Sequence, residues 1–180
     1  MIPAGQLLNA APQGESSATL DRPIDHLIAC HDRILQRLDT LVRAGGALDS
    51  ERRTEAIEAV RRTLAFFDSN GLWHTQDEEQ SVFPRMRPLL SAEEAAYLDR
   101  LEEEHRRAEE VYSRVHALGG KLSLSTGSDE DYRIAAEELA RLYRAHIASE
   151  NDTLVSTARR VLDTAQLASI STEMKQRRGR

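Results

Sequence analysis

The chain has 180 residues, enough for one domain with a substantial apolar core. Apolar residues make up 40% and charged residues 30% of it, which is typical of soluble globular proteins, and a formal net charge of −6 argues against broad nucleic-acid binding. No apolar run approaches the ~20 residues of a membrane span, and the single Cys30 allows no disulfide within the chain. The N-terminal stretch lacks the positive start and apolar run of a secretory signal. We expect a cytoplasmic protein, monomer or weak homodimer, with no nucleic-acid or membrane partner.

The first predicted helix follows a segment, residues 1–20, that we expect to be flexible because it is rich in Ala, Gly, Ser, Pro and Gln. Asp21 is the expected N-cap, Pro23 suits the first turn, and Gly45–Gly46 closes the helix. Its apolar residues recur at spacings of three and four and form one stripe: Ile24, Leu27, Ile34, Leu38 and Leu41. This spacing predicts an amphipathic helix that buries one face.

The second predicted helix is irregular. It begins near DSERRTEAIEAV, which starts at Asp49, and meets the turn-forming sequence DSNG at 68–71, where we expect a kink or break. It resumes across His74 and ends near Pro84 or Pro88.

Two more long helices follow. A capping box, SAEE at 91–94, opens the third helix, which ends at Gly119–Gly120. After the loop KLSLSTGS, the fourth helix starts at Ser128. Beyond it we expect a last short helix over about 164–176 and a solvated basic tail, KQRRGR.

Four long amphipathic helices with short connections predict an all-α fold, an antiparallel up-down four-helix bundle over residues 21–163. The kinked second helix is its irregular element. Residues 164–180 are expected to form a C-terminal extension of helix and basic tail.

One histidine lies near the middle of each predicted helix: His31, His74, His105 and His146. His31 and His105 fall on the apolar stripes of their helices. Taken alone, a histidine on a helix is most often structural or solvated. Four imidazoles buried in one bundle, however, are costly unless each is hydrogen-bonded or bound to a metal.

Three of the six histidines have a glutamate four residues later: His74/Glu78, His105/Glu109 and His146/Glu150. Such a pair projects from one helix face, with its members about 5–6 Å apart. On facing helices these pairs either bind one metal each or bridge two metals through their carboxylates. Imidazole with carboxylate suits iron or manganese, and zinc less uniquely. The Glu-x-x-His motif that ferritin-like di-iron bundles need twice occurs here only at Glu102/His105.

The stretch FFDSNGLWHTQDEEQSVFPRM resembles the hemerythrin-like family, also called HHE cation-binding domains. The segments LIACHDRIL, LEEEHRRAEEVY and LYRAHIASENDTLVSTA extend the resemblance over about residues 21–163. It implies a four-helix bundle around two iron ions with an oxo or hydroxo bridge. Carried over by position, the terminal ligands are His31 and His105, the ligands of one iron each are His74 and His146, and the bridging carboxylates are Glu78 and Glu150.

The chain departs from the oxygen-carrying hemerythrins at two positions. They have a second histidine in the third helix, where this chain has Glu109, and His-x4-Asp in the last helix, where it has His146-x3-Glu150. Simple reversible oxygen carriage is therefore not favoured. Glu109 stays open as a seventh ligand, an outer hydrogen-bond acceptor or a solvated residue.

Three functional hypotheses follow. The first is a non-haem di-iron protein that binds or senses O2, NO, peroxide or iron itself in a stress response. The second is a di-iron enzyme with peroxide-disproportionating, oxidase or iron–sulfur cluster repair activity. The third is a metal-free helical interaction module.

The other notable side chains have plainer interpretations. Core packing is favoured for the aromatic residues, including Trp73, Tyr112 and Tyr143, and Cys30 is expected to be a small buried residue. His26 and His116 are expected at the surface.

Overall fold

The computed structural model describes residues 20–123 and 129–180, and every regular element within them is a helix. The flexible segment predicted for residues 1–20 lies outside this range except for Leu20, as does most of the predicted loop before the fourth helix. No helix in the described residues has the length and apolar character needed to cross a membrane.

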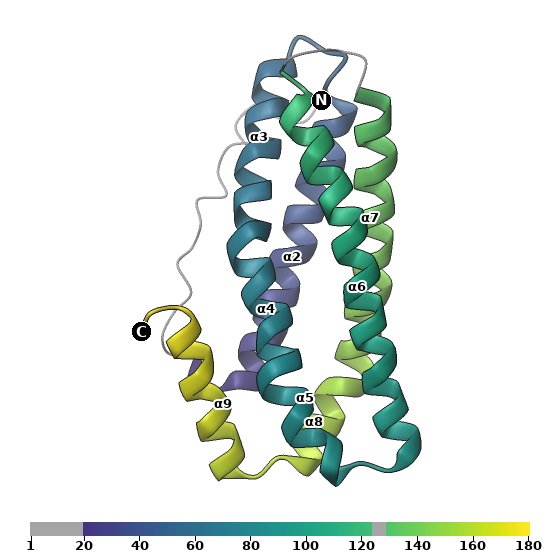
Figure 1. The fold of residues 1–180 in the computed structure, drawn as a ribbon. Helices are drawn as coiled ribbons and strands as arrows, with labels where there is room; N and C mark the ends of the chain where they lie inside the picture. The colour runs from purple at the N-terminus through teal and green to yellow at the C-terminus, as the bar shows by residue number, and fades with distance from the viewer. Residues whose placement is uncertain (1–19, 124–128) are drawn as a thin grey trace.

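Four helical rods run alternately up and down (Figure 1). The first rod is α2 (Pro23–Gly46) and the third is α6 (Ala92–Lys121). The second consists of α3 (Arg53–Phe66), the π-helix η2 (Phe67–Gly71), α4 (Leu72–Asp77), the π-helix η3 (Glu78–Val82), α5 (Phe83–Met86) and the short 3₁₀-helix η4 (Arg87–Leu89). The fourth consists of α7 (Asp129–Ser149), the π-helix η6 (Glu150–Leu154) and α8 (Val155–Val161). The predicted all-α bundle is confirmed.

The helix ends test the predicted caps. The capping box of Ser91 and Glu94 is present, and α2 ends at Gly46 as predicted. The predicted N-cap Asp21 is wrong: Arg22 holds that position without a side-chain cap. The Asp21 carboxylate instead pairs with Lys175.

The sequence DSNG does not break the second rod. The helix continues from α3 to α4 through one π-helical segment, Phe67–Gly71. A Cβ at position 71 would lie 3.0 Å from the Phe67 ring, so a glycine lets that ring pack against its own helix. The irregularity predicted here is a local widening of the helix.

Two apolar clusters fill the bundle. One cluster, called the upper cluster, includes Ile34, Leu64, Val111 and Leu139, and the other, called the lower cluster, includes Leu27, Val82, Leu101 and Leu154. Each rod contributes to both clusters and carries a buried histidine close to the point where its two contributions meet. The polar side chains therefore form one layer across the middle of an otherwise apolar core.

A further helix, α9 (Thr164–Arg177), folds back beside the lower half of the second rod (Figure 1). Asp163 and Gln166 form a capping box at its start, and Ile170 and Met174 are buried in the lower cluster. The solvated basic tail predicted after it is wrong at Arg177 and Arg178. Both guanidinium groups pair with the buried carboxylate of Asp77, which offsets part of the cost of its burial.

Candidate metal centre

Six side chains of the polar layer converge on one point: His31, His74, Glu78, His105, His146 and Glu150. They form two groups of possible metal donors. One group holds His31 and His74, the other holds His105 and His146, and both include Glu78 and Glu150. Within each group the candidate ligand atoms lie within 4.8 Å of one another, and all six side chains are buried. All six ligands predicted from the sequence are therefore brought together.

The two carboxylates face both histidine pairs at once. Glu78 Oε1 lies 3.8 Å from His31 Nε2 and 3.5 Å from His74 Nε2, while its Oε2 lies 3.4 Å from His105 Nε2. Glu150 Oε2 lies 3.2 Å from His31 Nε2, and its Oε1 lies 3.2 Å from His146 Nε2. Each carboxylate thus presents one oxygen to each pair, which is the arrangement of a bridging ligand.

The donor atoms of this cluster lack ordinary hydrogen bonds. The Nε2 atoms of the four histidines and all four oxygens of the two glutamates have no hydrogen-bond partner among the described residues. A buried polar atom without a partner costs free energy, and that cost is offset when the atom binds a metal. The residues therefore fit two metal ions, each with four protein donors.

Three of the histidines are oriented by a hydrogen bond at Nδ1, the ring nitrogen that faces away from the cluster. His31 Nδ1 donates to Asn151 Oδ1, His105 Nδ1 to Glu79 Oε1 and His146 Nδ1 to Glu104 Oε2, each over 2.8 Å. Such acceptors fix the proton on Nδ1 and leave the Nε2 lone pair for a metal. His74 differs, because its Nδ1 has no hydrogen-bond partner among the described residues.

The charges of the cluster shift its pKa values. Burial alone would lower the pKa of His31, but Glu150 and Glu78 outweigh it and raise that pKa to about 10. Burial would likewise lower the pKa of His105, but Glu78 and Glu79 outweigh it and raise that pKa to about 10. Burial lowers the pKa of His74 to about 4. Burial would raise the pKa of both carboxyls, yet the histidines hold it below its usual value. Protons on His31 and His105 thus balance the two carboxylates in the metal-free site.

A π-helical turn begins at each bridging candidate. Glu78 is the first residue of η3 and Glu150 the first of η6. Pro84 cannot donate to the carbonyl four residues earlier, which lies inside η3, and this favours a wider turn there. Single π-turns are frequent at functional sites. The sequence motifs placed the glutamates on helices but gave no sign of these turns.

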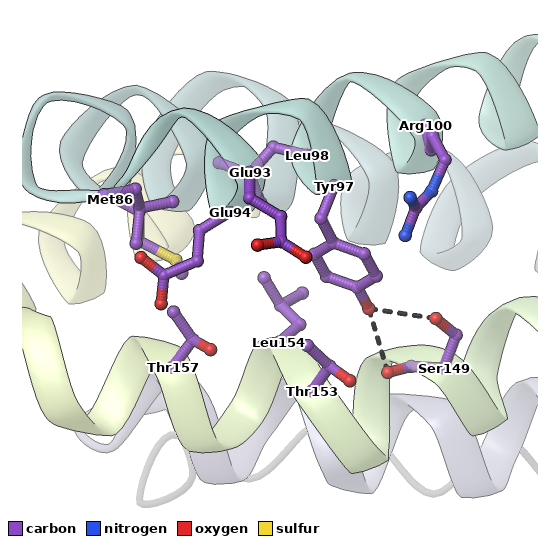
Figure 2. A pocket seen from close by; sticks show the side chains of 11 residues that line it. Met86, Glu93, Glu94, Tyr97, Leu98, Arg100, Ser149, Thr153, Leu154 and Thr157 are labelled. Atoms are coloured by element: carbon purple, nitrogen blue, oxygen red, sulfur yellow. Dashed lines mark hydrogen bonds between the residues drawn. The ribbon is translucent and has the colours of Figure 1, made fainter.

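A pocket of about 300 Å³ adjoins the second of these turns. Figure 2 shows its wall, where the Tyr97 hydroxyl lies 2.9 Å from the backbone oxygen of Ser149 and 3.0 Å from its Oγ. Ser149 directly precedes Glu150, so Tyr97 braces the helix that carries this carboxylate. Leu98 and Leu154 supply apolar lining, while Glu93 and Thr153 are among the polar residues at its edge.

The remaining predictions have mixed outcomes. Glu109 is exposed and belongs to neither donor group, so its solvated interpretation fits the structure. His116 is exposed and Cys30 is buried, as predicted. His26 is not at the surface as predicted but fully buried, because α9 covers it and Arg178 Nη2 lies 3.4 Å from its Nε2.

The aromatic residues pack around the layer. The Phe83 ring lies parallel to that of His105, with centroids 6.3 Å apart, and the Tyr143 ring meets His146 edge-on at 6.5 Å. Burial raises the pKa of Tyr143, so its phenol stays neutral. Trp73 is only partly buried and lies under Arg178.

Sequence reasoning missed the three acceptors behind the histidines. Glu79 stands in the Glu-Glu pair of the second helix, Glu104 directly precedes His105, and Asn151 directly follows Glu150. A neighbour of a ligand points about 100° away on its own helix, where it reaches a histidine of the next helix. The signal that could have identified these acceptors is that each stands next to a predicted ligand in the sequence.

Comparison with known proteins agrees with this geometry. A family model described as the hemerythrin HHE cation binding domain matches residues 22–158, which include all six converging residues. No curated protein matches the chain.

Proposed function

The chain belongs to the family of hemerythrin HHE cation-binding domains, and from that premise we propose that it is a non-haem di-iron protein that binds or senses O2, NO, peroxide or iron itself. The ligand set is His31, His74, Glu78, His105, His146 and Glu150. We further propose that it acts in the cytoplasm, in a stress response, as a monomer or weak homodimer.

One observation carries this proposal: Glu78 and Glu150 each present one oxygen to each histidine pair. Two carboxylates shared in this way support a pair of ions rather than one. The donor set of imidazole and carboxylate supports iron or manganese, and the family description supports a cation without naming it.

The number of donors supports the binding of a small molecule. Four protein donors per ion leave positions free on an iron ion, which accepts about six. The bound ions would supply redox chemistry and a place for a diatomic ligand or peroxide. The residues of this chain would hold them, keep a proton on Nδ1 of His31, His105 and His146 and surround the site with apolar side chains such as Phe83.

Metal analysis with an absorption spectrum tests the proposal. Protein expressed in iron-rich medium should contain about two irons per chain and show the near-ultraviolet bands of a bridged ferric pair, and these bands should change on adding NO or peroxide. The same protein with no more than trace metal, and with melting indifferent to chelators, would support the metal-free interaction module instead.

The enzymatic alternative is favoured by the pocket beside η6. Its volume of about 300 Å³ and its mixed lining are suited to a small substrate. We propose peroxide disproportionation, oxidase chemistry or iron–sulfur cluster repair as this alternative. Oxygen evolution from peroxide, lost in His74→Ala, would support it, and metal-replete protein without turnover would contradict it.

A further inference from the structure

The second rod carries a polar stripe that faces α9. Asp77, Ser81 and Arg85 follow one another at intervals of four residues, so they share one face of the helix. His74 and Glu78, which face the metal centre, lie in the same turns. The stripe and the two proposed ligands therefore belong to one short segment and contact different partners, α9 and the metal centre.

Partners of the stripe come from the end of α9 and the residue after it. Arg177 Nη1 donates to Asp77 Oδ1 over 2.7 Å, and Arg178 Nη2 donates to Asp77 Oδ2 over 2.8 Å. The Asp77 side chain is 0% exposed and that of Arg178 2%. Arg178 also lies over the Trp73 ring, 5.4 Å from its centroid. A buried carboxylate inside the ligand-bearing helix is thus neutralised by α9.

The same contacts reach into the π-turn. Ser81 donates to Glu173 over 2.5 Å and accepts from Arg177 over 2.6 Å. Arg85 pairs with Glu173 over 2.6 Å and donates to the backbone oxygen of Ser81 over 2.9 Å. The turn that begins at Glu78 is therefore held from outside the bundle at both of its ends.

His74 depends on this support more than the other histidines do. His31, His105 and His146 each have a Nδ1 acceptor, whereas His74 Nδ1 has none among the described residues. The direction of its ring consequently depends on where its helix lies, and α9 packs against that helix.

We propose that α9 is a latch that positions His74 and Glu78 and so controls how firmly the ion on the His31–His74 side is retained. Asp77, Ser81, Glu173, Arg177 and Arg178 are its positioning residues. This inference rests on the proposed metal binding. It assigns a metal-retaining role to a helix beyond the family match, which ends at residue 158.

Metal release from the full-length protein tests the latch. Anaerobic protein loaded with Fe²⁺ is mixed with an excess of a ferrous chelator, and release of the two ions is followed in time. In Arg178→Ala the ion on the His31–His74 side should leave at least about tenfold faster, since losing an outer support of a ligand costs 10–100-fold in affinity. The other ion, which shares Glu78 but not His74, should be accelerated much less. Arg178→Lys, which keeps the charge, should restore part of the difference.

Two further variants separate positioning from stability. Glu173→Gln weakens the grip on Ser81 and Arg85 without leaving a buried charge unpaired, and it should also speed the release of one ion. Arg53→Ala is the matched control, because Arg53 likewise joins two segments by pairing with Asp129 and the Leu122 backbone oxygen, at the far end of the bundle. It should lower the melting temperature and leave both release rates unchanged.

The outcomes distinguish the two proposals. Wild-type rates for both ions in Arg178→Ala and Glu173→Gln, or equal acceleration of both ions there and in Arg53→Ala, would overturn the latch alone. A wild-type chain that takes up no metal would overturn the latch and the proposed function together.

Discussion

The two histidine pairs of the centre share both carboxylates but are held in different ways. His105 and His146 have ring centroids 4.6 Å apart and donate to Glu79 and Glu104, acceptors within the bundle. In the other pair, with centroids 4.9 Å apart, His31 has Asn151 behind it, while His74 has no acceptor among the described residues.

This difference shows two ways to orient a histidine that is a candidate metal ligand. A charged acceptor behind the ring fixes both its rotation and its proton. A ring without such an acceptor takes its direction from its backbone, and the backbone of His74 lies between the apolar core and α9. The rings of His105 and His146 are thus each oriented by a hydrogen bond to a side chain. The His31–His74 pair is oriented partly by helix packing.

Removing a shared carboxylate should have the largest effect, because it strikes both pairs at once. Glu78→Ala or Glu150→Ala should reduce the metal content from two ions per chain to less than one, measured by elemental analysis of purified protein. Glu79→Ala, one residue away, removes only the acceptor of His105 and should retain more than half of the metal. Two full ions in Glu78→Ala would contradict a bridging role.

Metal uptake should rise steeply with pH. In the metal-free protein the pKa of His31 and of His105 is raised to about 10, so each ion must displace a proton when it binds. Uptake measured by competition with a chelator of known pH dependence should strengthen roughly tenfold per pH unit for each displaced proton between pH 6 and 8. Affinity independent of pH would exclude this protonation.

The same pKa values predict that the metal-free protein becomes less stable as pH rises, whereas metal uptake becomes stronger. A raised pKa adds stability that is fully present below the unfolded value of 6.5 and is lost as pH rises towards about 10. The free energy of unfolding of the chelator-treated protein should fall over this window. His31→Gln should show a smaller fall, and identical slopes would count against His31 as a source.

The acceptors behind the rings should have an intermediate effect confined to one pair. Glu104→Gln weakens the support of His146 and should lower the affinity for one ion about 10–100-fold, with the second ion little changed, as measured by titration with Mn²⁺. Glu103→Gln is the neighbouring control, since Glu103 is exposed and pairs with Arg106. Equal weakening of both ions would mean that the pairs are not held independently.

Helical periodicity predicted the bundle and the four histidines, and the resemblance to hemerythrin-like domains selected Glu78 and Glu150 from the three His/Glu pairs. His31 and His105 lie on apolar stripes, and the spacing of four brings Glu78 and Glu150 to the faces of His74 and His146. Positions that depend on one helix alone were within reach of such reasoning.

Contacts between different helices could not be predicted from the periodicity of a single helix. His26 was expected at the surface and Arg178 in solvent, yet each is buried because α9 turns back onto the second rod. A basic tail looks solvated until its acidic partner is known, and Asp77 gave no sign in the sequence that it was buried. The Nδ1 acceptors Glu79, Glu104 and Asn151 escaped for the same reason.

Glu109 should have the smallest effect, and it decides between interpretations that the sequence left open. The side chain is exposed and outside both donor groups, so Glu109→Ala should leave two ions bound and change the free energy of unfolding by less than about 0.5 kcal/mol. Elemental analysis and urea unfolding measure the two quantities. A loss of one ion would mean that Glu109 turns inward as a seventh ligand when metal is present. That result would make the His105–His146 pair richer in donors than the His31–His74 pair.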